Sequence, residues 1–261
     1  MRLIPEKGRV AICGPHGLGK TTLSAWLIHW FALTRDGYDW KILTTASSWR
    51  QLVVYLWPEV HKWASYLDWK KIGREPYKDG VELQKMGLRL STGAATAIAS
   101  NRHQKMEGAH AEHLLFVFDE AKIIPIPTWD AVEGAFSGAG ADTTREAYAL
   151  AISTPEDETG RFYEIFQRKP GLEDWHPIQI QMQQLVKWGR MSEQWAEQRR
   201  LLWGETSAVY RNRVLGEFAS SAGDGVITLA WVNAAIERYR EKEALDNPEM
   251  AQLLHDIMTA A

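Results

Sequence analysis

Cysteine is almost absent from this 261-residue chain, in which Cys13 is the only one. A single cysteine cannot form an intramolecular disulfide, which is consistent with a reducing compartment. The eight histidines do not combine with it in the spacing of a zinc site. The sequence therefore gives no support to a disulfide-stabilised secreted domain or to a zinc-binding module.

Long apolar runs and an excess of positive charge are missing as well. No run approaches the length of a membrane span, and the first residues lead directly into charged positions and a strand pattern, so we expect neither a membrane segment nor a signal peptide. The formal net charge is −3. A nucleic-acid partner would therefore have to meet a local basic patch or the combined surface of an oligomer.

Tryptophan, by contrast, is frequent, with 13 residues. Five of them fall within helical patterns: Trp26, Trp30, Trp49, Trp57 and Trp63. We interpret these side chains as packing in the core or at a subunit interface, with stacking on nucleic-acid bases as the alternative.

The stretch GPHGLGKTT, residues 14–22, has the G-x-x-x-x-G-K-T pattern of the phosphate-binding loop of nucleotide hydrolases. An apolar strand pattern precedes it at 9–13, and a helical pattern follows at 21–33. Its three glycines permit positive φ angles and a close approach of backbone N–H groups to an anion, and the helix N-terminus adds partial positive charge. The flanking strand and helix favour a nucleotide site over an ordinary glycine-rich turn.

The side chains of this loop have distinct expected roles. Lys20 should reach the β- and γ-phosphates of ATP, and the Thr21 hydroxyl should ligate Mg²⁺. We interpret His16 as a spacer rather than a catalyst. The other nucleotide-binding positions of the loop are Gly14, Pro15, His16, Gly17, Leu18, Gly19 and Thr22.

Two carboxylates, Asp119 and Glu120, directly follow the apolar strand pattern at 114–118. We expect Asp119 to hold Mg²⁺ through its water shell and Glu120 to polarise the water that attacks the γ-phosphate. A solvated strand end is the alternative, and the phosphate-binding loop upstream argues against it. A second apolar strand pattern ends in Ser153 and Thr154, whose hydroxyls could sense the γ-phosphate, although Ser-Thr-Pro is also an ordinary strand exit.

Strand patterns alternate with helical patterns along the chain and predict a three-layer, mostly parallel α/β sheet, on which ligands bind at the carboxyl ends of the strands. Pro58 is expected to kink or divide the second helix. Strands are predicted at 9–13, 41–45, 114–118, 147–153 and 176–182, short strands and hairpins at 79–100, helices at 21–33, 48–67, 128–136 and 160–168, and a mostly helical chain from 185 onward.

The order of these motifs resembles the ATPase half of the large terminase subunit of tailed bacteriophages. The resemblance extends from about residue 8 to about residue 232 and rests on GPHGLGKT, TTASSWRQ, EGAHAEHLLFVFDEA, DAVEGAFSG, ISTPEDETGRFYEIF and YRNRVLGEF. It implies a P-loop NTPase of the additional-strand class with a C-terminal helical subdomain. In it, residues 14–21 are the Walker A loop, Asp119 and Glu120 the Walker B pair, and residues 153–155 the coupling motif.

The resemblance also implies a motor that uses ATP and Mg²⁺ to package double-stranded DNA into a procapsid. Its partners would be the portal protein and a small terminase subunit, and its assembled form a homo-oligomeric ring on the portal. Such a protein works in the cytoplasm of the bacterial host and docks transiently on the procapsid.

Two departures from that family pattern shape the expected domains. Only residues 1–8 precede the first strand, where large terminases carry an adenine-contacting segment, and the chain stops where their nuclease domain begins. We therefore expect an ATPase domain alone or the product of a split gene, monomeric in isolation and without nuclease activity. The expected parts are an ATPase core at 1–182, a helical lid or linker at 183–219 and a helical tail at 220–261.

Phosphoryl transfer often uses an arginine from a neighbouring subunit. Some terminases carry an arginine inside the Walker A loop, but Pro15 and His16 occupy that part here, so the arginine must come from elsewhere. Arg102, in a polar loop shortly before the acidic pair, is our preferred candidate, with a solvated loop charge as the alternative reading. Arg145 and Arg161 are further candidates. A basic helical stretch could face DNA, although its acidic neighbours favour a solvated face. It comprises Arg199, Arg200, Arg211 and Arg213.

Two other functions stay open on the sequence. A helicase-like DNA translocase or remodelling ATPase shares both Walker motifs. A nucleotide-gated assembly module would bind ATP with negligible turnover, and the intact Lys20, Asp119 and Glu120 argue against it.

Overall fold

The computed structural model describes residues 3–99, 106, 109–137 and 145–220. The chain divides into two compact units, Met1–Ala219 and Ser220–Ala261. The predicted tail at 220–261, apart from Ser220, lies outside the described residues, as does Arg102. No helix in the described part of the chain is long and apolar enough to cross a membrane.

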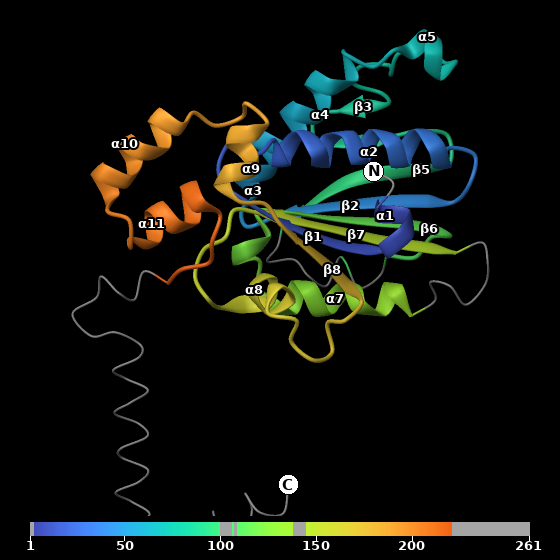
Figure 1. Cartoon of the computed structure of the whole chain (residues 1–261). Coiled ribbons are helices and arrows are strands. Elements are labelled where there is room, and N and C mark those ends of the chain that lie inside the picture. The colour runs from blue at the N-terminus through green and yellow to red at the C-terminus, as the bar shows by residue number, and fades with distance from the viewer. Residues whose placement is uncertain (1–2, 100–105, 107–108, 138–144, 221–261) are drawn as a thin grey trace, which may run out of the picture. The chain divides into compact units, whose positions relative to one another are not determined.

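An eight-stranded sheet forms the centre of the first unit (Figure 1). Its order is β3-β4-β5-β2-β6-β7-β1-β8. The six strands β5, β2, β6, β7, β1 and β8 run parallel to one another, and β3 and β4 add an antiparallel hairpin at the edge next to β5. The strands are β1 (Arg9–Cys13), β2 (Trp40–Ala46), β3 (Leu83–Gln84), β4 (Gly87–Arg89), β5 (Gly93–Ala99), β6 (His113–Asp119), β7 (Glu146–Ser153) and β8 (Trp175–Gln179). Because β7 lies between β1 and β6, the predicted additional-strand P-loop fold is confirmed.

The predicted central strands are confirmed, and their apolar runs explain why. In β6 and β7 every residue after the first is buried, as expected for parallel strands that are covered on both faces. The last strand is shorter than predicted and ends at Gln179. The reason is local, since Gln181 and Gln184 form a capping box that starts a helix at Met182.

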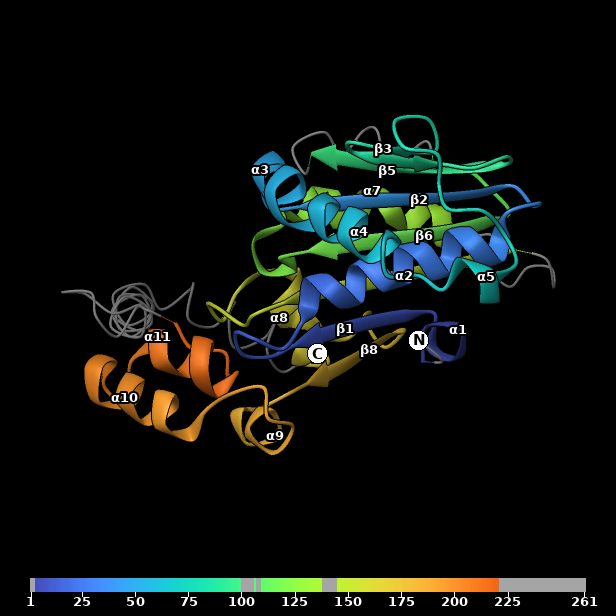
Figure 2. The same ribbon diagram turned by 90° about the horizontal axis from the view of Figure 1, so that it is seen from above.

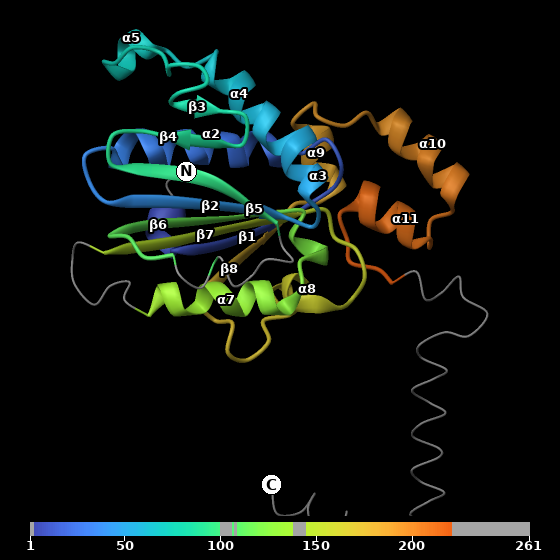
Figure 3. The same ribbon diagram turned by 180° about the vertical axis from the view of Figure 1, so that it is seen from behind.

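Helices cover both faces of the sheet (Figures 1 and 3). The long helix α2 (Lys20–Arg35) and α4 (Trp57–Ala64) lie on one face, and α7 (Ile126–Phe136) and α8 (Gly160–Phe166) lie on the other. The predicted three-layer arrangement is therefore confirmed. The remaining short helices of this part are α1 (Leu3–Lys7), α3 (Trp49–Gln51), α5 (Trp69–Ile72) and the 3₁₀ helix η3 (Ala121–Ile123).

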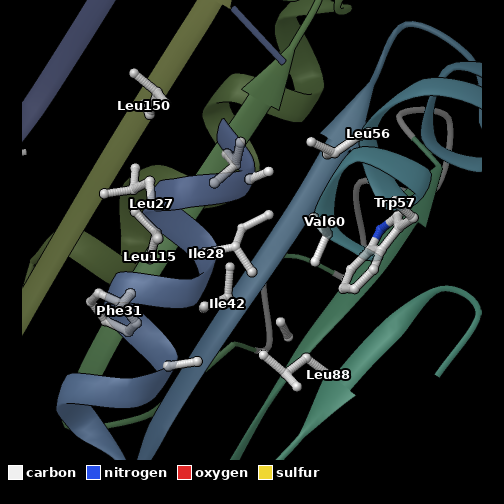
Figure 4. Packing of buried hydrophobic residues seen from close by; sticks show 14 of the residues in the cluster. Leu27, Ile28, Phe31, Ile42, Leu56, Trp57, Val60, Leu88, Leu115 and Leu150 are labelled. Carbon is white, nitrogen blue, oxygen red and sulfur yellow. The ribbon is translucent and has the colours of Figure 1, made fainter. Parts of the chain in front are cut away.

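The larger apolar core lies between α2 and the sheet (Figure 4). Leu27, Ile28 and Phe31 project from α2 at helical spacing and pack over the strands, where Ile42 and Leu115 are also fully buried. Burying one such side chain stabilises the fold by about 1.5–3 kcal/mol. This packing fixes α2, and with it the loop before α2, against the strand ends.

The second predicted helix runs from α3 through a π-helical turn, η1 (Leu52–Leu56), into α4. Ser48 caps it as predicted, because its side chain accepts a hydrogen bond from the N–H of Gln51. The π-helical turn ends at Leu56, two residues before Pro58, whose missing N–H and bulky ring disrupt a regular α-helical ladder. Ala64 is the last residue of this helix, three residues before the predicted end.

A helical subdomain follows β8 and lies at the carboxyl ends of the strands (Figure 2). Its small core contains Ala196, Tyr210 and Val214. The predicted helical stretch from 185 is interrupted at Gly189 and Gly204, both of which have positive φ. The subdomain consists of α9 (Met182–Lys187), α10 (Glu193–Trp203), α11 (Ala208–Tyr210) and the π-helical turn η4 (Arg211–Leu215).

Of the tryptophans expected to pack in the core or at an interface, some are buried in the core and others are exposed. Trp57 is fully buried, whereas Trp26 is 40% exposed and Trp49 is 48% exposed. For these two exposed side chains, packing at a subunit interface stays a prediction, with base stacking as the alternative.

Candidate nucleotide site

Strand register brings the predicted motifs to one edge of the sheet. Cys13, the last residue of β1, pairs with Ser153 of β7, and Asp119 of β6 pairs with Ile152 one position earlier. The phosphate-binding loop, the acidic pair and the Ser-Thr motif therefore leave the sheet together. Figure 2 shows this edge facing the helical subdomain.

The glycines of the loop differ in what they provide. Gly17 and Gly19 have φ angles of 82° and 86°, a left-handed region that favours glycine. Gly14 is not among the glycines with positive φ, so that part of the prediction is wrong for it. Close packing explains why this residue has no side chain: a Cβ there would lie 2.9 Å from Cδ2 of Leu18 and 3.1 Å from the carbonyl oxygen of Ile180.

The start of α2 presents free backbone donors to the loop. Gly19 is the N-cap, no side chain caps this end, and the first turn contains no acidic residue. Such an end attracts an anion through its unsatisfied N–H groups and partial positive charge. Thr21 lies in this first turn, partly exposed. The hydroxyl of Thr22 instead donates to Oε1 of Glu59 on α4 at 2.7 Å, which leaves its backbone N–H as its contribution to a phosphate site.

The ammonium of Lys20 lies over the loop. Its Nζ donates to the carbonyl oxygens of Gly14 and Pro15 at 3.2 and 2.8 Å. Burial lowers the pKa of Lys20 to about 8, although the negative charges of Glu120 and Asp119 oppose this shift. For this partly buried cation, the negatively charged oxygens of a polyphosphate would replace the neutral carbonyl oxygens as hydrogen-bond acceptors.

Asp119 is buried, with 4% of its surface exposed. Burial, and then the charge of Glu120, raise its pKa to about 7. Such a carboxylate fits a divalent cation, which would compensate its charge. Within the described residues no group of three or more His, Cys, Asp or Glu side chains could hold a metal ion, so Mg²⁺ here would share Asp119 and Thr21 with phosphate oxygens and water.

Glu120 has a left-handed backbone conformation with a φ of 49°, which is uncommon for a residue other than glycine. Its Oε2 accepts a hydrogen bond of 3.1 Å from Oγ of the fully buried Ser153. The strained turn and this hydrogen bond together fix the carboxylate at the strand ends.

The Ser-Thr motif is connected to residues that the sequence did not single out. Lys122, which follows the acidic pair, donates to Oγ1 of Thr154 at 3.2 Å and pairs with Glu156 at 3.3 Å. The carbonyl oxygen of Glu156 accepts a hydrogen bond of 3.1 Å from the N–H of Ala219. A continuous set of contacts thus runs from the acidic pair to the end of the first unit.

The end of the helical subdomain also packs directly on the phosphate-binding loop. The N–H of His16 donates to the carbonyl oxygen of Arg213 at 3.1 Å. Gly216 has a φ of 79°, and a Cβ there would lie 2.6 Å from the carbonyl oxygen of Ile180 and 2.8 Å from Cδ of Pro15. Burial and then the charges of Lys20 and Arg213 lower the pKa of His16, which agrees with a neutral spacer.

The structure places the arginine candidates in different settings. Arg161 pairs with Asp130 at 2.9 Å, and Arg145 directly precedes β7, at the sheet edge opposite the loop. The guanidinium of Arg190, which the sequence did not indicate, bonds to the loop carbonyl of Gly17. In the basic stretch, Arg200 pairs with Glu197 at 2.6 Å, Arg211 pairs with Glu217 at 3.2 Å, and Arg199 lies over the rings of Trp195 and Trp203.

Comparisons with known proteins give a consistent picture at the level of structure. No protein-family model and no curated protein matches the chain. Among solved structures, the large terminase ATPase domain of Thermus phage P74-26 has 20% sequence identity and a TM-score of 0.56, over 82% of this chain and 89% of that one.

Two longer phage proteins are also similar. The large terminase of the thermophilic bacteriophage D6E in complex with ATP-gamma-S has 13% identity and a TM-score of 0.57, over 83% of this chain and 49% of that one. The HK97 bacteriophage large terminase has 15% identity and a TM-score of 0.51, over 82% and 47%. The chain therefore spans about half the length of these two proteins. With its additional strand beside the phosphate-binding loop, the chain has the fold of the ATPase domains of phage large terminases.

Proposed function

We propose that this protein is an ATPase, the motor domain that drives double-stranded viral DNA into a procapsid. The observation that carries the proposal is the meeting of three motifs at one sheet edge: the phosphate-binding loop, the Asp119-Glu120 pair, and Ser153 bonded to Glu120. The likeness of its fold to a terminase solved with ATP-gamma-S supports the same reading.

The chain's own residues divide the chemistry between binding and hydrolysis. Backbone N–H groups of the loop and of the first turn of α2 would hold the phosphates, with Lys20 neutralising charge on the β- and γ-phosphates. Glu120, oriented by Ser153, would accept a hydrogen bond from the attacking water and polarise it toward the γ-phosphate. Thr154, bonded to Lys122, would respond to loss of the γ-phosphate.

A magnesium ion would be held by Thr21 and, through water, by Asp119. When bound, it would supply positive charge to the β- and γ-phosphate oxygens.

Contacts between the phosphate-binding loop and the helical subdomain support the proposed motor function. The contacts from Lys122 through Glu156 to Ala219, and from His16 to Arg213, give a phosphate-dependent change at the loop a direct route into the helical subdomain. We propose the portal protein and a small terminase subunit as partners, a homo-oligomeric ring as the working assembly, and the cytoplasm of the bacterial host as the place of action.

The test has two stages. Phosphate release from ATP is measured with the purified chain, with Mg²⁺ and with excess EDTA, and turnover in Mg²⁺ is expected; its absence would leave a nucleotide-gated assembly module. Displacement of a third strand from a DNA triplex, compared with displacement of one strand of a duplex, then distinguishes the proposed motor from a helicase. The motor releases the third strand and leaves the duplex paired, whereas unwinding of the duplex would contradict the proposal.

A further inference from the structure

Arg190 lies against the phosphate-binding loop although 173 positions separate it from Gly17 in the sequence. Its Nε and Nη2 donate to the carbonyl oxygen of Gly17 at 3.3 and 3.2 Å, and Nη2 lies 3.3 Å from where a Cβ of Gly19 would be. The guanidinium therefore rests on the two loop glycines whose positive φ angles shape the anion site.

The backbone of Arg190 is fixed relative to the same loop. Its N–H donates to the carbonyl oxygen of the fully buried Leu185 at 2.8 Å, just after the last turn of α9. That helix follows β8 closely, and β8 is tied to the P-loop strand through the bond from the N–H of Ile180 to the carbonyl oxygen of Cys13, at 2.8 Å. The backbone of Arg190 is therefore connected to the P-loop strand through α9 and β8.

The charge of Arg190 has a different setting from the charges of Arg161, Arg200 and Arg211. Arg161, Arg200 and Arg211 each pair with a carboxylate. Within the described residues Arg190 has no such pair, and its bonds reach one neutral carbonyl oxygen. A guanidinium has five N–H donors in a planar fork that matches phosphate oxygens, so donors remain for an anion bound in the loop.

The loop itself contains Lys20 as its only cationic side chain. A triphosphate brings more negative charge than one ammonium neutralises, and hydrolysis concentrates further charge on the transferred group. The nearby Lys122 is already engaged by Thr154 and Glu156. A second cation beside the loop would therefore neutralise phosphate charge that Lys20 alone leaves uncompensated.

We propose that Arg190 is a catalytic arginine of the nucleotide site, which contacts the polyphosphate within its own chain and stabilises the charge that develops during hydrolysis. This inference rests on the proposed ATPase function and adds to it a group from the helical subdomain. It also makes that subdomain part of the nucleotide site, so that its position and the state of the phosphates are coupled.

The alternative is a purely structural role, in which Arg190 only joins the end of α9 to Gly17. The substitution Arg190→Gln distinguishes this role from a catalytic one. Arg190→Gln retains an amide that can donate to the carbonyl of Gly17 but removes the charge. For a catalytic arginine, Arg190→Gln and Arg190→Ala should both slow single-turnover phosphate release at saturating ATP by at least about tenfold. Arg190→Lys should recover part of the rate, and Lys187→Ala, at the exposed end of the same helix, should match the wild type.

Hydrolysis by Arg190→Gln or Arg190→Ala at the wild-type rate would overturn the inference. Affinity for ADP with aluminium fluoride, a mimic of the transferred phosphoryl group, is the second readout: it should fall more than affinity for ADP in Arg190→Gln, and an equal fall would indicate a structural role. Mixing Arg190→Ala with Glu120→Gln tests the assignment to one chain, because any recovery of turnover would mean that Arg190 acts on a neighbour.

The wild-type protein distinguishes failure of this inference from failure of the proposed function. If the wild-type protein does not hydrolyse ATP, the ATPase proposal is wrong. Titration with ATP-gamma-S then tests whether Arg190 contacts the phosphates. A several-fold weaker affinity in Arg190→Gln would support the contact, and an unchanged affinity would overturn it.

Discussion

Ser153 donates a hydrogen bond of 3.1 Å from Oγ to Oε2 of Glu120, and so joins the ends of the adjacent strands β7 and β6. The serine is fully buried, and the glutamate has a strained left-handed backbone. The pair links the carboxylate proposed to polarise water to the first residue of the motif proposed to sense the γ-phosphate.

Removal of that hydroxyl should affect catalysis more than binding. Ser153→Ala leaves the charge of Glu120 in place but loses its orienting donor, so we expect kcat to fall by about tenfold with KM nearly unchanged. Ser137→Ala, an exposed serine after α7, serves as the control. Equal kcat values for Ser153→Ala and the wild type would show that the hydrogen bond does not position the catalytic carboxylate.

Lys20 and Glu120 should separate binding from chemistry. Lys20 meets the phosphates before and during hydrolysis, so Lys20→Ala should weaken ATP binding and abolish turnover. Glu120→Gln should slow hydrolysis by about a hundredfold or more while ATP affinity hardly changes, because its interaction with the attacking water matters in the transition state. ATP titration and single-turnover phosphate release measure both effects; wild-type hydrolysis by Glu120→Gln would remove Glu120 from the mechanism.

Two glycines with similar backbones test how tightly the helical subdomain packs on the loop. Gly216 and Gly73 have φ angles of 79° and 83° and ψ angles of 31° and 26°, but a Cβ meets neighbouring atoms only at Gly216, where it would lie 2.6 Å from the carbonyl oxygen of Ile180. Both alanine variants should lose about 1 kcal/mol through backbone strain, and Gly216→Ala should lose about 1–3 kcal/mol more through the clash. Urea unfolding gives the two values, and equal losses would contradict the close packing.

The buried His29 should make the stability of the fold sensitive to acid. Its Nε2 bonds to the carbonyl oxygen of Val60 at 2.9 Å and its Nδ1 lies 3.3 Å from the Tyr77 hydroxyl, a pairing that suits a neutral ring. Burial lowers its pKa from 6.5 to about 4. The unfolded chain therefore takes up the proton first, and the stability that His29 provides above pH 6.5 is lost as the pH falls toward 4.

Between pH 7.5 and 5 this loss amounts to about 2 kcal/mol. Urea unfolding of the wild type, of His29→Gln and of the control His176→Gln at both pH values measures it. His29→Gln should show a smaller drop between the two pH values than the other two proteins. A drop of the same size in all three would assign the acid sensitivity to other groups.

The sequence by itself determined the elements and the chemical motifs. The apolar runs that end at Cys13, Asp119 and Ser153 are local patterns, and each defines a buried strand with a functional residue at or just after its end. Because parallel strands carry their carboxyl ends to a common edge, recognition of those three runs was enough to predict that their motifs meet at one edge of the sheet.

Tertiary structure alone decided which distant residues contact the phosphate-binding loop and the Ser-Thr motif. Nothing in the local sequence of Arg190, Gly216 or Lys122 indicates a contact with the loop or the Ser-Thr motif, since these contacts join elements far apart in the chain. Periodicity reports which face of a helix or strand is buried, whereas the partner across the interface depends on how whole elements pack. The same limit explains why Thr22, inside the motif, directs its hydroxyl to Glu59 on a neighbouring helix.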